Sequence, residues 1–390
     1  MARANRFLCL ILIAATGALD TGRKQVYIVR HCVRRTGAII ADTGTPFSQP
    51  SDFTSQPVAE WPAPPFWCAG QGALDILQGS GADLRDRFIP RNTTDIRVIA
   101  DTMMRDGDTA LSLLRGLGDA TVPFSYRPGL FKSLTPDMPP ALCHTNSTDI
   151  QVQASVQARL AQLPMPADYN STVALLQSAI GVGRAGDIRD MPPVSVAPNG
   201  QTLLGGMNVL RFFVQELFYS WAANVSYAAR GKLSEDDLYE LMQWQHWYRA
   251  VVNLNPYWAT QNAALLHSAM LDLQEPGAHS TLYVGHDSNQ DGFATLLDAQ
   301  WDAPPFKGGE QLLPTPPGSA LQIEYDPVSD RVSASFLYAN FTGSGSSSDG
   351  VLKQRTVEGL DGITMQQLQA RVDRGIATNS EAAACYHKEI

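Results

Sequence analysis

Three short apolar segments stand out because each is rich in β-branched or aromatic residues and ends abruptly at polar residues. They cover residues 26–29 (VYIV), 95–100 (DIRVIA) and 281–284 (TLYV). Runs of this length and composition predict buried β-strands. Open α/β sheets bind their ligands just outside the carboxyl ends of the strands. The polar residues that follow each segment are therefore the first candidates for a functional site.

Elsewhere the apolar positions follow a helical period. They predict a helix at residues 109–117 and a helical, aromatic-rich region from about 202 to 273. There Ser234 and Asp237 have the spacing of a capping box. The broad apolar face that follows predicts a packed helical core, and His246 on this helix is expected to be packed or exposed rather than a ligand. Two late apolar runs, at about 320–325 and 332–338, predict a hairpin.

These elements predict the α/β class, with a mainly parallel sheet flanked by helices and an inserted α-helical cap. We expect residues 22–131 and 274–390 to form the sheet domain and residues 132–273 to form the mostly helical cap. The cleft between the two parts would hold a ligand.

The residues after the first segment are Arg30, His31 and Arg34. Burial of two guanidinium groups beside an imidazole is unfavourable unless an anion joins them. Phosphate is the simplest such anion, and a histidine can act as its nucleophile. The alternative interpretation is a strand followed by a solvated basic turn.

The other two segments end in similar chemistry. Gly285, His286 and Asp287 follow the late strand, where a histidine can donate to phosphate and a carboxylic acid can protonate a leaving group. Arg105 lies near the start of the helix after residues 95–100, where backbone N–H groups also favour anions. Taken singly, a satisfied His-Asp pair and a surface arginine would be the simpler interpretations.

Together the segments resemble the histidine phosphatase superfamily, specifically its acid phosphatase and phytase branch, which includes periplasmic phytases and glucose-1-phosphatase-like enzymes. The motifs match in order: Arg-His-x-x-Arg at residues 30–34, Ala-Asp-x-x-x-Arg at 100–105 and His-Asp at 286–287. Glu60-Trp61-Pro62 and Thr315-Pro316-Pro317-Gly318 are further passages similar to the family.

The resemblance implies a role for each matching residue. His31 would be the nucleophile that forms a phosphohistidine, and Asp287 would be the proton donor to the leaving group. The phosphate oxygens would be bound by Arg30, Arg34, Arg105 and His286. This scheme requires no metal and no cofactor. Because Asp287 must be protonated to act as an acid, we expect an acidic pH optimum.

The sequence also departs from the family pattern. Cys32 stands where phytases often have glycine, Thr36 where a proline is common, and Ser288 is closer to the sugar phosphatase relatives. By resemblance, Arg35 and Glu216 are candidates for the substrate pocket. The expected substrate is phytate or a broad range of sugar phosphates, and glucose-1-phosphatase-like specificity is the alternative.

The first 18 residues are expected to be a signal peptide. Arg3 and Arg6 precede an apolar run at residues 7–15 that is too short to span a bilayer, and small residues follow it. This predicts a periplasmic or extracellular protein with no membrane association after removal of the leader. Five Asn-x-Ser/Thr acceptors suggest surface positions, namely Asn92, Asn146, Asn170, Asn224 and Asn340.

Cysteine usage fits export. Beyond Cys9 in the leader, four cysteines remain, which allow three pairings. The resemblance favours Cys143 with Cys385, and Cys32 with Cys68 is then the remainder. Their wide spacing makes a metal site an unfavourable interpretation.

The 390 residues are 44% hydrophobic and carry a formal charge of −9. An acidic surface argues against nucleic acid and anionic membranes as partners, so we expect a small-molecule phosphomonoester as the partner of a monomer. A Gly/Ser-rich run at residues 343–350 predicts a flexible surface loop. Two other classes stay open, a phosphoglycerate-mutase-type enzyme and a phosphate-binding module without turnover.

Overall fold

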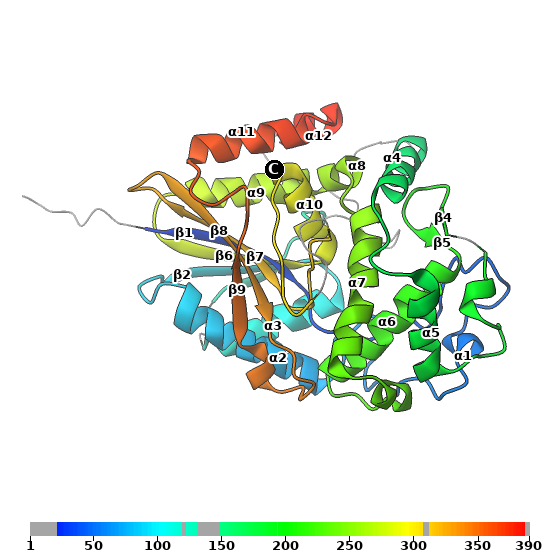
Figure 1. Ribbon diagram of the computed structural model, residues 1–390. Coiled ribbons are helices and arrows are strands. Elements are labelled where there is room, and N and C mark those ends of the chain that lie inside the picture. Colours follow the sequence, from blue (N-terminus) through cyan, green and yellow to red (C-terminus); the bar gives the residue numbers. More distant parts are fainter. Residues whose placement is uncertain (1–21, 119–121, 132–148, 193, 307–311, 387–390) are drawn as a thin grey trace, which may run out of the picture.

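The computed structural model describes residues 22–118, 122–131, 149–192, 194–306 and 312–386. At its centre is a seven-stranded sheet with the strand order β3-β2-β6-β1-β7-β8-β9 (Figure 1). The strands are β1 (Lys24–Arg30), β2 (Asp95–Ala100), β3 (Phe124–Tyr126), β6 (His279–Gly285), β7 (Ala320–Asp326), β8 (Arg331–Ala339) and β9 (Leu352–Thr356).

The pairing of the strands aligns the ends of the three segments predicted from the sequence. β1 is parallel to β6, with Arg30 opposite Gly285, and β2 is parallel to the other side of β6. β7 is antiparallel to β1 and forms the predicted hairpin with β8. Among the described residues, five of the seven strands run in one direction. The predicted α/β class with a mainly parallel sheet is confirmed.

Helices cover both faces of this sheet. On one face lie α2 (Gln71–Asp83) and α3 (Met104–Leu117). On the other lie α9 (Ala263–Gln274), α10 (Asp287–Leu297), α11 (Met365–Ile376) and α12 (Ser380–Tyr386). In α11 the buried residues Leu368, Val372 and Ile376 recur every four positions, which gives the helix a single apolar stripe. Every residue of β1 is buried between these layers.

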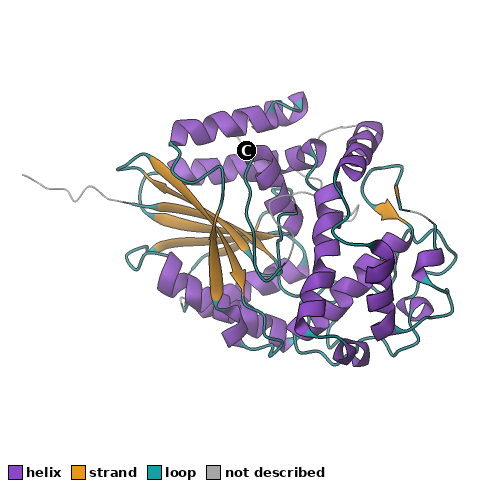
Figure 2. Ribbon diagram, viewed as in Figure 1, coloured by secondary structure: helices purple, strands orange, loops and turns teal. Residues whose placement is uncertain are grey.

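A second group of helices lies beside the carboxyl ends of the parallel strands (Figure 2). It contains α4 (Asp149–Gln162), α5 (Tyr169–Ile180), α6 (Gly206–Ala222), α7 (Glu235–Val252) and α8 (Pro256–Ala259), with the short strands β4 (Ser195–Val196) and β5 (Leu203–Leu204). The predicted capping box is present at the start of α7, where Ser234 and Asp237 exchange hydrogen bonds. Trp244 and Trp247 are fully buried, as the apolar face predicted.

The segment after β1 contributes to this helical part. It contains α1 (Pro50–Phe53), and its backbone bonds to α5 and to the start of α6: Ser55 N donates to Ile180 O, and Gly205 N donates to Asp42 O. The remaining short helical turns are Leu84–Phe88, Ile188–Asp190, Ala228–Lys232, Thr260–Asn262 and Ser347–Gly350. In the described part of the chain, no helix has both the length and the hydropathy needed to cross a bilayer.

Two local predictions differ from the structure. The helix predicted at residues 109–117 begins earlier, at Met104. The prediction missed its first turn because that turn carries the polar residues Arg105 and Asp106, which the apolar pattern could not include. The Gly/Ser-rich run at 343–350 is not a free loop. Asp349 is fully buried and accepts hydrogen bonds from Thr342 and Ser344, and the run lies against α2.

Of the five Asn-x-Ser/Thr acceptors, Asn92, Asn170 and Asn224 are exposed and Asn340 is half-buried. Asn146 lies outside the described residues. Residues 132–148, which lie between the sheet and α4 in the sequence, are the longest internal range outside the described residues.

Candidate active site

The site is built at the carboxyl end of β1. Arg30 is the last residue of the strand, and His31 N donates to Gly285 O at 2.8 Å. The next strand, β6, ends at Gly285, so His31 and His286 leave the sheet side by side. Their ring centroids are 5.5 Å apart. The structure therefore brings together the first and last predicted motifs.

His31 is held with one ring nitrogen free. Its Nδ1 lies 2.9 Å from the carbonyl oxygen of Cys32, and since a carbonyl can only accept, Nδ1 carries the proton and Nε2 keeps its lone pair. The side chain is 3% exposed. Burial and the nearby Arg105, His286 and Arg30 lower the pKa of His31 well below its ordinary value. A neutral imidazole with a free Nε2 is the form that can attack phosphorus.

Arg30 and Arg34 extend from the strand end toward helix α6. Arg30 is 2% exposed and donates to Tyr219 Oη at 3.0 Å and to the carbonyl of Thr315. Its buried Nε has no hydrogen-bond partner in the described ranges. Arg34 donates to Gln215 Oε1 at 3.3 Å. Burial, with Arg105 and Arg30 nearby, lowers the pKa of Arg34 to about 10, so it stays charged at neutral pH.

Arg105 reaches the same place from the first turn of α3. Its Nη2 lies 3.3 Å from His286 Nδ1, and its buried Nε has no hydrogen-bond partner among the described residues. Among the residues that the structure describes, neither Arg34 nor Arg105 forms an ion pair with a carboxylate. Three guanidinium groups are thus gathered around His31. Arg30 contributes to the lowered pKa of both Arg34 and Arg105, and a bound phosphate would relieve this repulsion.

His286 is fully buried, and its two neighbours fix its protonation. Guanidinium nitrogens only donate, so Nδ1 accepts from Arg105, and Nε2 donates to Asp101 Oδ2 at 2.9 Å. Burial lowers the pKa of His286, and the bond to Asp101 opposes this. In this arrangement His286 orients Arg105, and a hydrogen bond from His286 to phosphate would require protonation of Nδ1.

Asp287 begins α10, and its carboxylate lies between two arginines. Oδ2 is 3.1 Å from Arg30 Nη2 and 3.6 Å from Arg249 Nε, while Oδ1 accepts from Ser288 N at 2.9 Å. Burial raises the pKa of Asp287, but the combined effect of Arg30, Arg249 and the other nearby cations is larger and lowers it, so the net shift is downward. A phosphate dianion bound to Arg30 would raise this pKa toward the range that a proton donor needs.

Asp101, Asp106 and His286 could be considered as metal ligands, since their ligand atoms lie within 4.8 Å of one another. However, burial raises the pKa of Asp106 well above its ordinary value, which favours a neutral carboxylic acid. The guanidinium of Arg105 would also repel a cation at this place. The donor set thus fits a hydrogen-bonded support for His286 better than a metal centre.

Solved structures resemble this one along almost its full length. Hafnia alvei phytase in complex with myo-inositol hexakis sulphate has 18% identity and a TM-score of 0.72, covering 91% of this chain and 96% of that chain. Citrobacter braakii phytase has 16% identity and a TM-score of 0.71, covering 91% and 98%. Klebsiella sp. ASR1 phytase has 21% identity and a TM-score of 0.67, covering 91% and 96%.

This chain has the phytase fold. The resemblance predicted from the motifs is thereby confirmed at the level of the fold. No protein-family model matches the sequence, and no curated protein is significantly similar to it. At these identities the comparison shows the fold alone, so the chemistry of the site has to be argued from the contacts of its own side chains.

Several residues of the site were not predicted from the sequence. In this phytase fold, α6 supplies Tyr219 and Gln215, which contact Arg30 and Arg34, and α7 supplies Arg249. Tyr219 and Gln215 are one helical turn apart on a helix with a large apolar surface, and this spacing of two polar side chains is the feature that could have marked them. Thr315, in a passage noted as similar to the family, accepts from Arg30.

Two cavities lie along the segment that follows β1. One of about 180 Å³ is lined by residues that include Arg34, Phe66, Arg211 and Gln215. The other, of about 190 Å³, is lined by residues that include the predicted pocket residues Arg35 and Glu216. Glu216 is buried, accepts from Trp61 Nε1 at 2.8 Å and from Thr36, and burial raises its pKa.

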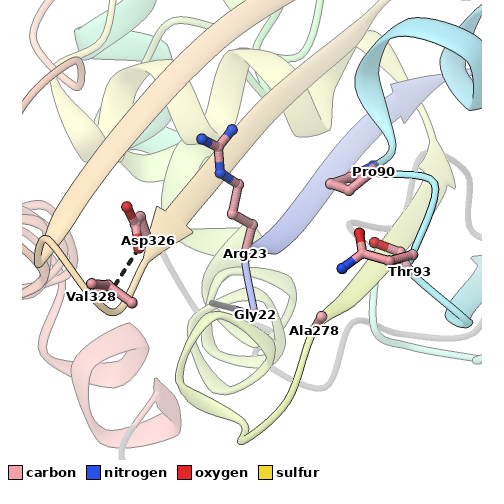
Figure 3. A pocket seen from close by; sticks show the side chains of 8 residues that line it. Gly22, Arg23, Pro90, Thr93, Ala278, Asp326 and Val328 are labelled. Carbon is pink, nitrogen blue, oxygen red and sulfur yellow. Dashed lines mark hydrogen bonds between the residues drawn. The ribbon is translucent and has the colours of Figure 1, made fainter. Parts of the chain in front are cut away.

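A larger cavity, of about 390 Å³, lies away from these residues (Figure 3). It is lined by Gly22, Arg23, Ala278 and Asp326, which flank the amino ends of β1 and β6 and the carboxyl end of β7. His31 follows the carboxyl end of β1, so the cavity lies at the opposite end of the parallel strands and takes no part in the site.

A disulfide joins Cys32 to Cys68, with the Cα atoms 5.6 Å apart. This predicted pairing is confirmed, and it ties the residue after His31 to the segment before α2. Cys385 is also disulfide-bonded. Its predicted partner Cys143 lies outside the described residues, so that pairing stays a prediction.

Proposed function

We propose that this protein hydrolyses phosphomonoesters through a phosphohistidine intermediate on His31. The observation that carries the proposal is the neutral imidazole of His31 with a free Nε2, which lies among three guanidinium groups, one of which also contacts the carboxylate of Asp287. These are the groups that a two-step phosphoryl transfer needs.

In the first step Nε2 of His31 forms a bond to phosphorus while the bond from phosphorus to the ester oxygen breaks. Arg30, Arg34 and Arg105 stabilise the charge on the non-bridging oxygens. Asp287 gives its proton to the leaving oxygen. In the second step water attacks phosphorus, the N–P bond breaks, Asp287 takes up a proton from the water, and inorganic phosphate is released.

The substrates that we propose are phytate and sugar phosphates, with a glucose-1-phosphatase-like preference as the alternative. Support comes from the fold shared with phytases and from the two cavities along the segment after β1, one lined by residues that include Arg34 and the other by residues that include Arg35. We also propose export to the periplasm or the extracellular space, which the Cys32–Cys68 disulfide supports. Phosphate release from phytate, glucose 1-phosphate and p-nitrophenyl phosphate at several acidic pH values would rank the substrates.

The proposal predicts that His31→Ala lowers hydrolysis of p-nitrophenyl phosphate to the background rate, because no other group can form the covalent intermediate. Alkaline quenching of the parent during turnover should trap one phosphoryl group on the peptide that contains His31. His267→Ala is the matched control, since His267 lies on α9 against Tyr386 and is remote from the site in the fold. We expect it to keep the parent rate.

Equal rates for the parent and His31→Ala would refute the enzymatic proposal and leave a phosphate-binding module. A requirement for a phosphorylated acceptor, without release of inorganic phosphate to water, would instead indicate a mutase. Both outcomes are read from the same assay with and without an added phosphorylated acceptor.

A further inference from the structure

Arg249 is a buried cation at the point where helix α7 meets the proposed proton donor. It is 2% exposed and lies in the last turn of α7. Its Nε is 3.1 Å from Asp291 Oδ2 and 3.6 Å from Asp287 Oδ2, and its Nη2 also bonds to Asp291. Nη1 donates to the carbonyl of Leu313 at 3.4 Å. The guanidinium is thus shared between two carboxylates of α10.

The position of Asp291 makes this arrangement directional. It lies four residues after Asp287, on the same face of α10, and is fully buried. Asn253 donates to it at 3.0 Å, which completes a fixed support for Arg249. The Nε edge of Arg249 is therefore held against Asp287, while Arg30 contacts the same Oδ2 atom from β1.

We propose that Arg249 is a positioning residue for the proton donor, which holds Asp287 Oδ2 opposite Arg30 and sets the upper pH limit of activity. The inference rests on the proposed function, because it takes Asp287 as the acid. It goes further because it assigns to Arg249, on helix α7, control over the protonation of Asp287, on helix α10.

The charged and titratable groups that face Asp287 come from every element around it. They are Arg30 from β1, Arg34 from the segment after β1, Arg105 from α3, His246 and Arg249 from α7, and His286 and Asp291 from α10 and its cap. A bound phosphate occupies Arg30, Arg34 and Arg105. Arg249 contacts Asp287 from α7 and is paired with Asp291, so its effect on Asp287 persists in the substrate complex.

The sign of the effect follows from this geometry. A cation close to a carboxyl group favours the ionised form. Asp287 has to be protonated when the ester bond breaks, so activity falls as the pH rises above the pKa of Asp287 in the substrate complex. Removal of Arg249 should raise that pKa and move the alkaline limb of the kcat profile upward by about one pH unit, because Asp291 already offsets part of the charge.

Arg249→Met is the direct test, and the double variant Arg249→Met/Asp291→Asn is the second, because the single change leaves Asp291 buried without its partner. Both should move the alkaline limb to higher pH, the double variant by less. Arg249→Lys keeps the charge and should leave the limb near that of the parent. Arg159→Met is the matched control. Arg159 lies on α4 and donates to the carbonyl of Ala250 on α7, the helix that carries Arg249, but it does not contact a carboxylate of the site.

Two readouts separate positioning from simple damage. The variants should lose more kcat on an alkyl phosphate than on p-nitrophenyl phosphate, because p-nitrophenolate leaves without a proton. The titration of Asp287 can also be followed by the ¹³C carboxyl signal that is missing in Asp287→Asn. This readout does not need turnover, so it separates failure of the inference from failure of the proposed function.

Unchanged limbs in both Arg249→Met variants, with an unchanged titration of Asp287, would overturn the inference. An equal shift in Arg159→Met would also overturn it, because the effect would then arise from any loosening of α7. A shifted titration in a protein without phosphatase activity would keep the positioning role and refute the proposed function alone.

Discussion

His31 and His286 show how a neighbouring atom decides the chemistry of a side chain. The same residue type is protonated on Nδ1 in His31, where a carbonyl accepts, and on Nε2 in His286, where Asp101 accepts. The first tautomer leaves Nε2 free for attack, and the second leaves Nδ1 to accept from Arg105. Neither assignment could be made from the motifs, because the acceptors are a backbone carbonyl and a residue from another strand.

His246 gives a prediction at the same scale. It is fully buried on α7, and neither ring nitrogen has a hydrogen-bond partner within the part of the chain that the structure describes. Burial together with Arg249 and Arg30 lowers its pKa well below the ordinary value. The folded protein therefore excludes a proton that the unfolded chain takes up below about pH 6.5. Stability should be present above that pH and be lost progressively as the pH falls.

His246→Phe should remove this loss, because phenylalanine cannot titrate and can pack in the same way against Phe306. We expect the variant to gain about 2 kcal/mol relative to the parent when the free energy of unfolding is compared between pH 5 and pH 8. Urea denaturation at the two pH values measures this, and the comparison cancels any constant packing difference. A difference that does not vary with pH would contradict the prediction.

At the scale of elements, α2 and α3 approach each other through glycines. A Cβ atom on Gly116 would lie 2.0 Å from the carbonyl oxygen of Gln78, and one on Gly81 would lie 2.3 Å from that of Leu113. Such close backbone contact is possible only without side chains. Because α3 carries Arg105 in its first turn, the spacing of the two helices also sets the reach of that arginine.

Gly116→Ala should therefore force the helices apart and lower the free energy of unfolding by about 1–3 kcal/mol, despite the better helix propensity of alanine. Gly231→Ala is the matched control, since a Cβ at Gly231 meets no atom within 4 Å. Urea denaturation of both variants tests this. Equal stability of the two variants would show that the helices adjust without cost.

The elements predicted from local pattern are the ones whose reasons are local. β1, β2, β6 and the β7–β8 hairpin follow from short apolar runs, and α7 follows from its capping box. The first turn of α3 and the ordered run at 343–350 were not predicted. Their polar residues are buried by contacts with segments far away in the sequence, and no local pattern reports such contacts.

For the whole molecule, the motifs predicted which residues meet at the strand ends but not what the helical layer adds. His31, Arg30, Asp287 and their neighbours follow from strand ends that the sheet aligns. Tyr219 and Arg249 depend on which faces of α6 and α7 turn toward the sheet. That choice is made by tertiary packing, so the sequence could not supply it.

The Cys32–Cys68 disulfide yields a prediction about the whole chain, because it acts on the unfolded state. The bridge closes a loop with a sequence separation of 36 residues. The double variant Cys32→Ala/Cys68→Ala should lower the free energy of unfolding by about 2–4 kcal/mol through chain entropy. It should also lower kcat, because Cys32 directly follows His31, the proposed nucleophile. Urea denaturation and phosphate release measure the two effects.

Reductant is a poor substitute for this double variant, because Cys385 is also in a disulfide. Addition of reductant to the double variant reports the contribution of that other bond alone. Parent-like stability of the double variant would mean that packing around the loop, rather than the covalent link, holds the nucleophile in place.

The strand order carries a consequence for biosynthesis. β6 separates β1 from β2, so the two strands that emerge first from the ribosome are not neighbours in the finished sheet. Until residues 279–285 have been made, a nascent chain has nothing to fill the place between them, and Arg105 cannot be aligned with His31. The proposed site therefore cannot form through most of translation.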